Sequence, residues 1–356
     1  VLLAAGTHAV VGGTTYLVID TLNSVFSNSN GGFGTLGGSP GPSDSASPGE
    51  TFAGPTTPPL PQPFADGRLD ILLVGADAGP GRWSLRTDTL IVLSVDVNTG
   101  RAALFGIPRN LIGVPLGPES KAAYACGCFP DLINALYVYA SAHPKYFPGT
   151  DDTRGLLAVQ GAISQLTGLR LDGMVVVKLN GFVKLVDAIG GVDIKVPYAI
   201  HDSRYPLENG KGYIVLNITK GQHHFDGSQA LAFARSRHQD SDYGRMQRQQ
   251  ITLTALAKQL TGDQSIITQV PELLAIAKDN LWTNLNVDDL SQFIELALRA
   301  DIAHMAHITF IPPKYPEVMT PAEITRIQSV TANALTTPLP TPTPSPSPKP
   351  TPSGSP

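Results

Sequence analysis

The arginines are the residues whose type and spacing point most directly to chemistry. Four of them occur close together in this chain of 356 residues, whose formal net charge is -4: Arg235, Arg237, Arg245 and Arg248. A guanidinium group donates two parallel hydrogen bonds to phosphate oxygens, so such a cluster suits a pyrophosphate. The alternative is a solvated face on which the arginines pair with Asp240 and Asp242. Composition alone does not separate these two interpretations.

The second half of this cluster lies on a predicted helix. Residues 242–260 have helical spacing, with an aspartate at the start that can cap the first turn. On that helix Arg245, Arg248 and Gln249 are three and four residues apart, so their side chains are expected to share one face. The first two arginines of the cluster are two residues apart on a segment expected to be extended. They should therefore point to the same side of a sheet.

Two carboxylates form a second group with a chemical role. Asp77 follows a predicted strand over residues 69–75, and Asp88 comes just before another over residues 89–95. Carboxylates at neighbouring strand ends can converge on one cation. Few dedicated oxygen ligands fit Mg²⁺, which keeps several waters and takes others from substrate phosphates, and Mn²⁺ accepts the same ligands. The alternative is a turn in which Asp77 caps backbone amides and Asp88 pairs with Arg86.

The elements that must position these residues indicate an α/β domain. Apolar runs and turn signals predict further strands and helices: strands over 101–107, 173–179, 192–196 and 307–311, and helices over 152–166, 181–189 and 290–299. Such an order predicts one mixed sheet with helices on its faces. Arg109 directly follows Pro108, which ends the third strand, and is expected at the same edge as the two carboxylates.

Composition divides the chain into five parts. The expected boundaries are a truncated membrane anchor at 1–22, a flexible Ser/Gly/Pro linker at 23–66, the catalytic domain at 67–315, a helical segment at 316–335 and a disordered Pro-rich tail at 336–356. The apolar first segment could also be a signal-peptide remnant or a buried helix. The first two interpretations place the domain outside the cytoplasm, and the anchor places it at the cell membrane.

Charge and cysteine content exclude some classes of function. The chain has 25 basic and 29 acidic residues, so its overall field does not attract nucleic acid. Its two cysteines, Cys126 and Cys128, are too few for a disulfide scaffold and do not match a zinc site. In an oxidising compartment they could bridge each other across a tight ring, and otherwise they are two half-buried thiols.

Ordered blocks of the sequence resemble the LytR-CpsA-Psr family. The blocks lie at residues 73–77, 86–89, 107–109, 121–124, 185–193, 230–237 and 242–250. Together they cover roughly residues 69–260, with a plausible domain end near 313. One position departs from the family pattern, because Asn110 follows Pro108-Arg109 where the family has an aspartate. This departure leaves the general base unassigned.

The resemblance implies a three-layer α-β-α sandwich that binds a polyprenyl-pyrophosphate-linked glycan, with the lipid in an apolar groove. It implies Asp77 and Asp88 as metal ligands. Pyrophosphate-binding residues are expected at Arg86, Arg109, Lys121, Arg235, Arg237, Arg245, Arg248 and Gln249. Four of them are expected to be catalytic: Arg86, Arg109, Arg235 and Arg237.

The implied reaction is a Mg²⁺-dependent transfer of the glycan phosphate to a sugar hydroxyl of peptidoglycan, which releases polyprenyl phosphate. Two alternatives stay open. Water could replace the sugar hydroxyl, which would make the protein an isoprenoid pyrophosphatase. The protein could also bind lipid phosphates without catalysis, as a regulator, although the sequence has no helix-turn-helix signal.

Overall fold

The structure is a computed structural model. It describes residues 64, 66–76, 87–207, 212–237, 241–262, 266–285 and 289–336. The predicted anchor, nearly all of the linker and the tail beyond residue 336 lie outside these residues, and so do Asp77 and Arg86. Among the described residues, no helix is both long and apolar enough to cross a bilayer.

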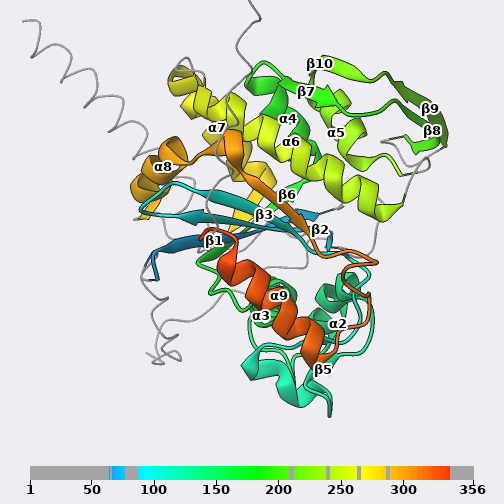
Figure 1. The fold of residues 1–356 in the computed structure, drawn as a ribbon, viewed down its shortest axis with the longest axis vertical. Coiled ribbons are helices and arrows are strands. Elements are labelled where there is room, and N and C mark those ends of the chain that lie inside the picture. The colour runs from blue at the N-terminus through cyan, green and yellow to red at the C-terminus, as the bar shows by residue number, and fades with distance from the viewer. Residues whose placement is uncertain are drawn as a thin grey trace, which may run out of the picture.

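A mixed sheet forms the centre of the fold (Figure 1). Its strands run in the order β11 (Leu281–Thr283), β6 (Gly173–Lys178), β1 (Arg68–Ala76), β2 (Thr87–Asp96), β3 (Ala102–Gly106) and β12 (Ala306–Thr309). β1, β2 and β3 form an antiparallel meander, while β6 and β12 are parallel to their neighbours β1 and β3. The parallel pairs require long crossovers, and these carry the helices.

Helices cover both faces of this sheet (Figure 1). One layer contains α4 (Leu179–Ala188), α5 (Gly227–Arg235), α6 (Asp242–Gly262) and α7 (Ile266–Asn280), with α8 (Leu290–Arg299) at its side. The other contains α2 (Leu136–Ala142), α3 (Arg154–Thr167) and α9 (Pro321–Asn333). The predicted three-layer α-β-α sandwich with a central mixed sheet is therefore confirmed.

Strand β1 shows how the sequence divides the two layers. Leu72 and Val74 are almost fully buried in the core formed with α3 and α9. Leu73, between them, packs on the opposite face against the cluster that includes Leu296 of α8. Successive side chains of a strand point to opposite faces, so a run that is apolar at every position predicts a strand covered on both sides.

Smaller sheets and short helices complete the described fold. They are the pairs β4 (Val114–Pro115) with β5 (Cys128–Phe129), β7 (Val192–Val196) with β10 (Gly221–Phe225) and β8 (Ile200–Pro206) with β9 (Tyr213–Ile218), and the 3₁₀ helices η2 (Pro118–Ala123), η3 (Ile133–Ala135) and η5 (Ile302–His304). Cys126 and Cys128 form a disulfide at the start of β5. Of the two states that the sequence allowed, the structure shows the bridged one.

The expectation of an extended segment through Arg235 and Arg237 was wrong. Residues 227–235 form helix α5, and Arg237 lies in the chain that follows it. Asp226 and Gln229 form a capping box at its start, in which each side chain bonds the backbone of the other. This pairing satisfies amides at the start of the helix that have no partner within it. It therefore favours a helix for a short apolar run whose composition would also suit a strand.

Candidate active site

The site begins where β2 starts and β3 ends. These strands are antiparallel, with Ile91 opposite Gly106. The end of β3 therefore lies beside the beginning of β2. Arg109 Nη1 donates to Asp88 Oδ1 at 2.8 Å, and Arg109 Nε donates to Asp242 Oδ2 at 2.8 Å. Three segments that are far apart in the sequence therefore meet at one guanidinium.

Helix α6 supplies the next side chains from its first two turns. Arg245 Nη2 donates to the backbone oxygen of Asp88 at 3.2 Å, and its Nη1 lies 3.6 Å from Asp242 Oδ1. One turn later, Gln249 Nε2 donates to Thr89 Oγ1 at 2.8 Å. Arg245 and Gln249 are four residues apart, so they share one face of the helix, and that face meets the start of β2.

Two more arginines of the predicted set come from the end of α5 and from the chain that follows it. Arg235 is the last residue of α5, and it lines an apolar cavity that is described below. Arg237 is exposed, and its Nη1 lies 3.7 Å from Asp242 Oδ1. Asp242 thus contacts Arg109, Arg237 and Arg245, so one carboxylate lies between three guanidinium groups.

The pKa values of the site favour its charged form. Burial alone would raise the pKa of Asp88, but hydrogen bonds from Arg109 and Asn134 outweigh it, and the pKa is lowered. Burial likewise opposes the charge of Arg109, while its bonds to Asp88 and Asp242 raise its pKa overall. Burial lowers the pKa of Arg245 to about 10, which still leaves this side chain cationic at neutral pH.

An apolar cavity of about 350 Å³ adjoins the arginines. It lies between the α6 face of the sheet and helices α4, α5 and α6. Its apolar walls include Leu73, Val177, Phe182, Leu231, Leu253, Leu256 and Leu260. Its polar lining residues are Thr89, Arg235, Gln249 and Thr252, and the first three belong to the arginine site. The cavity therefore combines an apolar interior with one polar, cationic end.

Arg248 does not take part in this site as predicted. Its side chain is 1% exposed, and its nitrogens donate to the backbone oxygens of Phe233 and Ser236 and to the Tyr198 hydroxyl. It lies three residues after Arg245, on a neighbouring face of α6 that packs on the end of α5. Its contacts fix the chain around Arg235 and Arg237, so it positions other arginines and its guanidinium is not directed to a ligand.

The other predicted residues fall into two groups. Lys121 is an exposed residue of η2 beside the disulfide loop, next to Gly127, and no contact joins it to the arginines among the described residues. Asp77 and Arg86 lie outside the part of the chain that the structure describes. Asn110 donates to Glu317 Oε1 at 2.5 Å, which directs its side chain to the segment before α9.

Sequence reasoning missed two contributors, Asn134 and Thr89, and assigned a third only in part. Asp242 was expected to cap α6 or to pair with the arginines on a solvated face, and its carboxylate contacts three arginines inside the site. Asn134 Nδ2 donates to Asp88 Oδ1 at 3.2 Å, and the hydroxyl of Thr89 accepts from Gln249. Asp242 follows the first two arginines and precedes the others, so its position among four like charges was the available signal. Asn134 had none, because only the fold brings it to β2.

The donor set of the described residues suits a hard divalent cation in part. Asp88 offers an ionised carboxylate, one oxygen of which is held by Arg109 and Asn134. Carboxylate oxygen is what Mg²⁺ requires, and a site with one or two protein ligands is usual for it. The described residues contain no cluster of three or more His, Cys, Asp or Glu side chains placed for a metal. The second predicted ligand, Asp77, is outside them.

Comparison with known proteins identifies the family. The model of the LytR_cpsA_psr family matches residues 50–328. The chain belongs to this family. Polyisoprenyl-teichoic acid–peptidoglycan teichoic acid transferase TagU of Oceanobacillus iheyensis is 30% identical to this LytR_cpsA_psr protein over 229 residues, which are 64% of this chain and 62% of TagU. The chain thus spans less than two thirds of this curated relative's length.

Solved structures show the same fold. Protein gbs0355 from Streptococcus agalactiae aligns with a TM-score of 0.57 and 20% identity, over 76% of this chain and 89% of gbs0355. TagT bound to LIIa-WTA aligns with a TM-score of 0.53 and 20% identity, over 76% of this chain and 92% of TagT. At this identity the similarity extends to the fold, and the LytR_cpsA_psr assignment rests on the family match.

Proposed function

We propose that this LytR_cpsA_psr protein is a phosphotransferase that moves a glycopolymer phosphate from a polyprenyl-pyrophosphate carrier to a sugar hydroxyl of peptidoglycan. One observation carries the proposal. Arg109, Arg235, Arg237 and Arg245 gather at the polar end of an apolar cavity, which is the shape of a lipid chain joined to a pyrophosphate. The names of relatives such as TagU, which describe a transferase acting on polyisoprenyl-linked teichoic acid and peptidoglycan, support it.

The cavity and the arginines bind different parts of the donor. A polyprenyl chain is an apolar ligand, and the leucine-rich walls remove it from water at roughly 25 cal/mol per Å² of buried apolar area. The pyrophosphate then lies beside Arg235 and Gln249, which line the cavity, and within reach of the neighbouring arginines. Bidentate guanidinium–phosphate contacts fix the orientation of the phosphorus atoms.

The reaction needs charge stabilisation more than covalent chemistry. The acceptor hydroxyl oxygen attacks the glycan-side phosphorus, the bond from this phosphorus to the bridging oxygen breaks, and polyprenyl phosphate leaves while the hydroxyl proton is released. Negative charge grows on the phosphoryl oxygens and on the leaving phosphate. Arg109 and Arg245 are fixed before the reaction by Asp88 and Asp242, so their charge is already oriented.

A divalent cation, Mg²⁺ or Mn²⁺, belongs to the proposal. When bound, it would neutralise phosphate oxygens and lower the cost of the developing charge. Asp88 would hold it together with Asp77. Asp88 is also bonded to Arg109, so its carboxylate aligns the cation site with the guanidinium that receives the phosphate. A membrane anchor and an extracytoplasmic catalytic domain complete the proposal, because the lipid carrier and the peptidoglycan acceptor meet at the outer membrane surface.

A reconstituted assay tests the function. The full chain is incubated with a polyprenyl-pyrophosphate-linked glycan and Mg²⁺, with and without soluble peptidoglycan strands. We expect acceptor-dependent release of polyprenyl phosphate and a covalent glycan–peptidoglycan product by mass spectrometry. Equal release without the acceptor would identify an isoprenoid pyrophosphatase. Donor binding without release, with or without the acceptor, would identify a non-catalytic binding protein, and either result would overturn the transferase assignment.

A further inference from the structure

A second cavity lies on the far side of α5 from the lipid cavity. It has a volume of about 490 Å³, within the range of small-ligand sites, and lies between the hairpin β8–β9, strand β10 and helix α5. We call it the hairpin cavity. Its lining residues are Tyr205, Pro206, Leu207, Ile214, Leu216, Asn217, Ile218, Thr219, His223, Phe225, Ser228, Gln229 and Ala232. The function proposed above does not use it.

The lining of the hairpin cavity is polar without being charged. Its described lining residues include amide and hydroxyl side chains from Asn217, Thr219, Ser228 and Gln229, and none of these described residues is a Lys, Arg, Asp or Glu. Asn217 Oδ1 contacts His201 Nδ1, and Gln229 Oε1 accepts from the Asp226 amide. The amide nitrogens of these two side chains have no partner among the described residues. They are donors that suit a ligand with neutral oxygen acceptors.

The cavity also offers flat apolar surface. The rings of His223 and Phe225 are stacked on β10 with centroids 5.2 Å apart and an interplanar angle of 20°. Next to the cavity, Tyr213 of β9 is 66% exposed and pairs with Pro206 of β8. Aromatic faces carry partial negative charge and attract the polarised C–H groups of a saturated ring. Ring faces beside amide and hydroxyl groups are the combination that matches a pyranose.

Helix α5 connects this cavity to the arginine site. Ser228, Gln229 and Ala232 line the hairpin cavity, whereas Leu231, Ala234 and Arg235 line the lipid cavity. Ala232 and Arg235 are three residues apart, about 4.5 Å along the helix axis. In addition, Asp202 of β8 accepts from the Ser236 hydroxyl and the Arg237 amide at 3.1 and 3.0 Å. The wall of the hairpin cavity is therefore bonded to the segment that carries Arg237.

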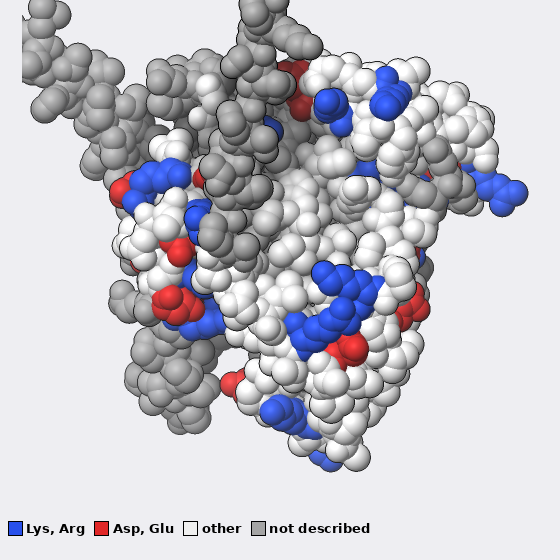
Figure 2. Space-filling view, viewed as in Figure 1, with Lys and Arg blue, Asp and Glu red and all other residues white. Residues whose placement is uncertain are grey.

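We infer that the hairpin cavity binds uncharged, N-acetylated sugar units of the acceptor strand and holds that strand beside the arginines. The inference rests on the proposed function. The described lining favours the acceptor over the donor. It has no lysine or arginine to pair with the phosphates of the donor polymer, whereas it offers amide groups and ring faces to a neutral sugar. Figure 2 shows Lys and Arg side chains in several small groups on this face, with Asp and Glu side chains beside some of them.

Binding is tested with a probe that cannot react. An uncharged N-acetylglucosamine oligosaccharide is titrated into the full chain by calorimetry. Ser228→Trp fills the cavity from an exposed position of α5, and Asn217→Ala removes an exposed amide; each should weaken binding, the first by roughly tenfold or more, which corresponds to about 1.4 kcal/mol. Ser329→Trp on α9 and Asn98→Ala in the β2–β3 turn are matched controls that should bind as the unaltered chain does. No binding at millimolar sugar, or equal affinity in all variants, overturns the inference.

Kinetics then identify the source of the sugar. In the transfer assay, Ser228→Trp should raise the KM for soluble peptidoglycan strands and leave the KM for the lipid-linked donor unchanged. A raised donor KM would place the donor glycan in the cavity and overturn the acceptor assignment. An unchanged acceptor KM in an active enzyme would overturn the subsite and leave the transferase intact. Failure of the unaltered chain to transfer would instead overturn the proposed function and the acceptor assignment with it.

Discussion

Two networks of arginine and aspartate lie at opposite ends of the strand pair β1–β2, and they differ in burial and in protonation. One is the candidate site, with Asp88 at the start of β2. The other surrounds Asp70, which lies near the start of β1 opposite Ser94 near the end of β2. Both use the same two residue types, so residue type alone does not decide which of them receives a ligand.

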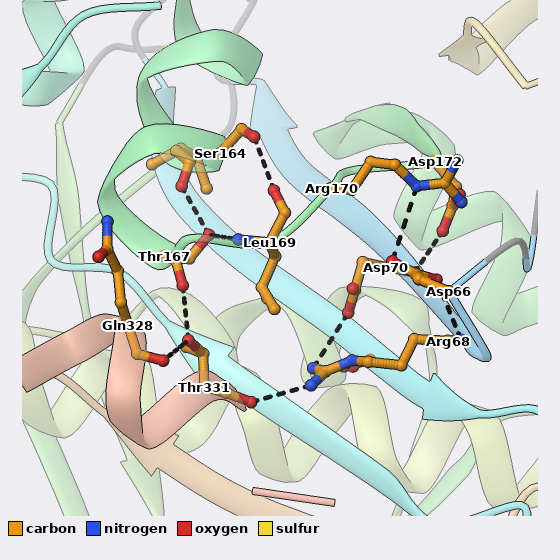
Figure 3. A network of polar contacts seen from close by, with 12 residues as sticks. Asp66, Arg68, Asp70, Ser164, Thr167, Leu169, Arg170, Asp172, Gln328 and Thr331 are labelled. Atoms are coloured by element: carbon orange, nitrogen blue, oxygen red, sulfur yellow. Dashed lines mark hydrogen bonds and ion pairs between the residues drawn. The ribbon is translucent and has the colours of Figure 1, made fainter. Parts of the chain in front are cut away.

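The second network is closed by the protein itself (Figure 3). Arg68 donates to Ser94 Oγ at 2.7 Å and to the backbone oxygen of Thr331 on α9 at 3.1 Å. The Asp70 amide donates to Asp172 Oδ2, and the Asp172 amide donates to the backbone oxygen of Asp70. Arg170 Nη2 lies 2.6 Å from Asp172 Oδ1. Both carboxylate side chains are 1% exposed. This network joins α9 to the end of the strand pair β1–β2, and its two carboxylates, Asp70 and Asp172, are buried and already paired with groups of the protein.

The pKa values of the two networks shift in opposite directions. Burial raises the pKa of Asp70, and it raises that of Asp172 to about 6. The pKa of Asp88 is lowered, because hydrogen bonds from Arg109 outweigh burial. Asp88, Arg109 and Asp242 are 23–26% exposed, so a phosphate can reach the guanidinium that they share. A network that keeps its charge and borders a cavity is the one suited to bind an anion.

The largest expected effect is a loss of turnover when the candidate site is changed. Arg109→Ala should lower turnover by about 10²-fold or more, because it removes a fixed donor from the developing phosphoryl charge. Its effect on the free energy of unfolding should be small, since both carboxylate partners remain partly hydrated. Turnover in the transfer assay and thermal unfolding check this, with Arg299→Ala on α8 as an exposed control. A folded Arg109→Ala protein with full turnover would contradict its role in the site.

The second effect is on stability. Arg68→Ala should lower the free energy of unfolding by about 2 kcal/mol, because it leaves the buried Asp70 carboxylate without its cation. Turnover at 25 °C should stay within a factor of two of that of the unaltered chain. This factor corresponds to a difference of about 0.4 kcal/mol. Denaturant unfolding measures the first quantity. A stability loss equal to that of the exposed Arg299→Ala control would show that the network does not hold α9 to the sheet.

The smallest expected effect is on the pH dependence of stability. The folded-state pKa of Asp172 is about 6, above its ordinary value of 3.8. Its contribution to the free energy of unfolding is therefore fully present below the unfolded pKa and is lost as pH rises through 6. Between pH 5 and 7 this loss amounts to about 1 kcal/mol. Asp88 has a lowered pKa, so its contribution is lost only as pH falls below its ordinary range.

Asp172→Asn isolates this contribution. Urea unfolding at pH 5, 6 and 7 should show a flatter pH dependence in the variant than in the unaltered chain, because the variant has no proton to lose at this position. Asp151→Asn, at an exposed carboxylate of the same layer, is the control and should keep the original slope. Parallel curves for Asp172→Asn and the unaltered chain would contradict the raised pKa.

The sequence predicted the elements that have a simple period more accurately than the side-chain roles. Strand β7 was expected over residues 192–196 and lies there, and the predicted α6 helix starts at Asp242 as expected. Apolar alternation and helical spacing depend on neighbours along the chain. Helix α5 was missed because the segment that leads to Arg235 and Arg237 was expected to be extended, and the capping box of Asp226 and Gln229 was not recognised. The role of Arg248 depends on which face of α6 packs on α5, which only the tertiary fold determines.

The buried guanidinium of Arg248 has a consequence for the cost of binding. It joins α6 to the carbonyl groups on either side of Arg235, so the backbone that carries the outer arginines is ordered when the protein folds. Fixing the backbone of one residue costs roughly 1–2 kcal/mol at 25 °C. For this segment that entropy is lost once, during folding. In the function proposed above, a multiply charged headgroup would meet a backbone segment that is already in place.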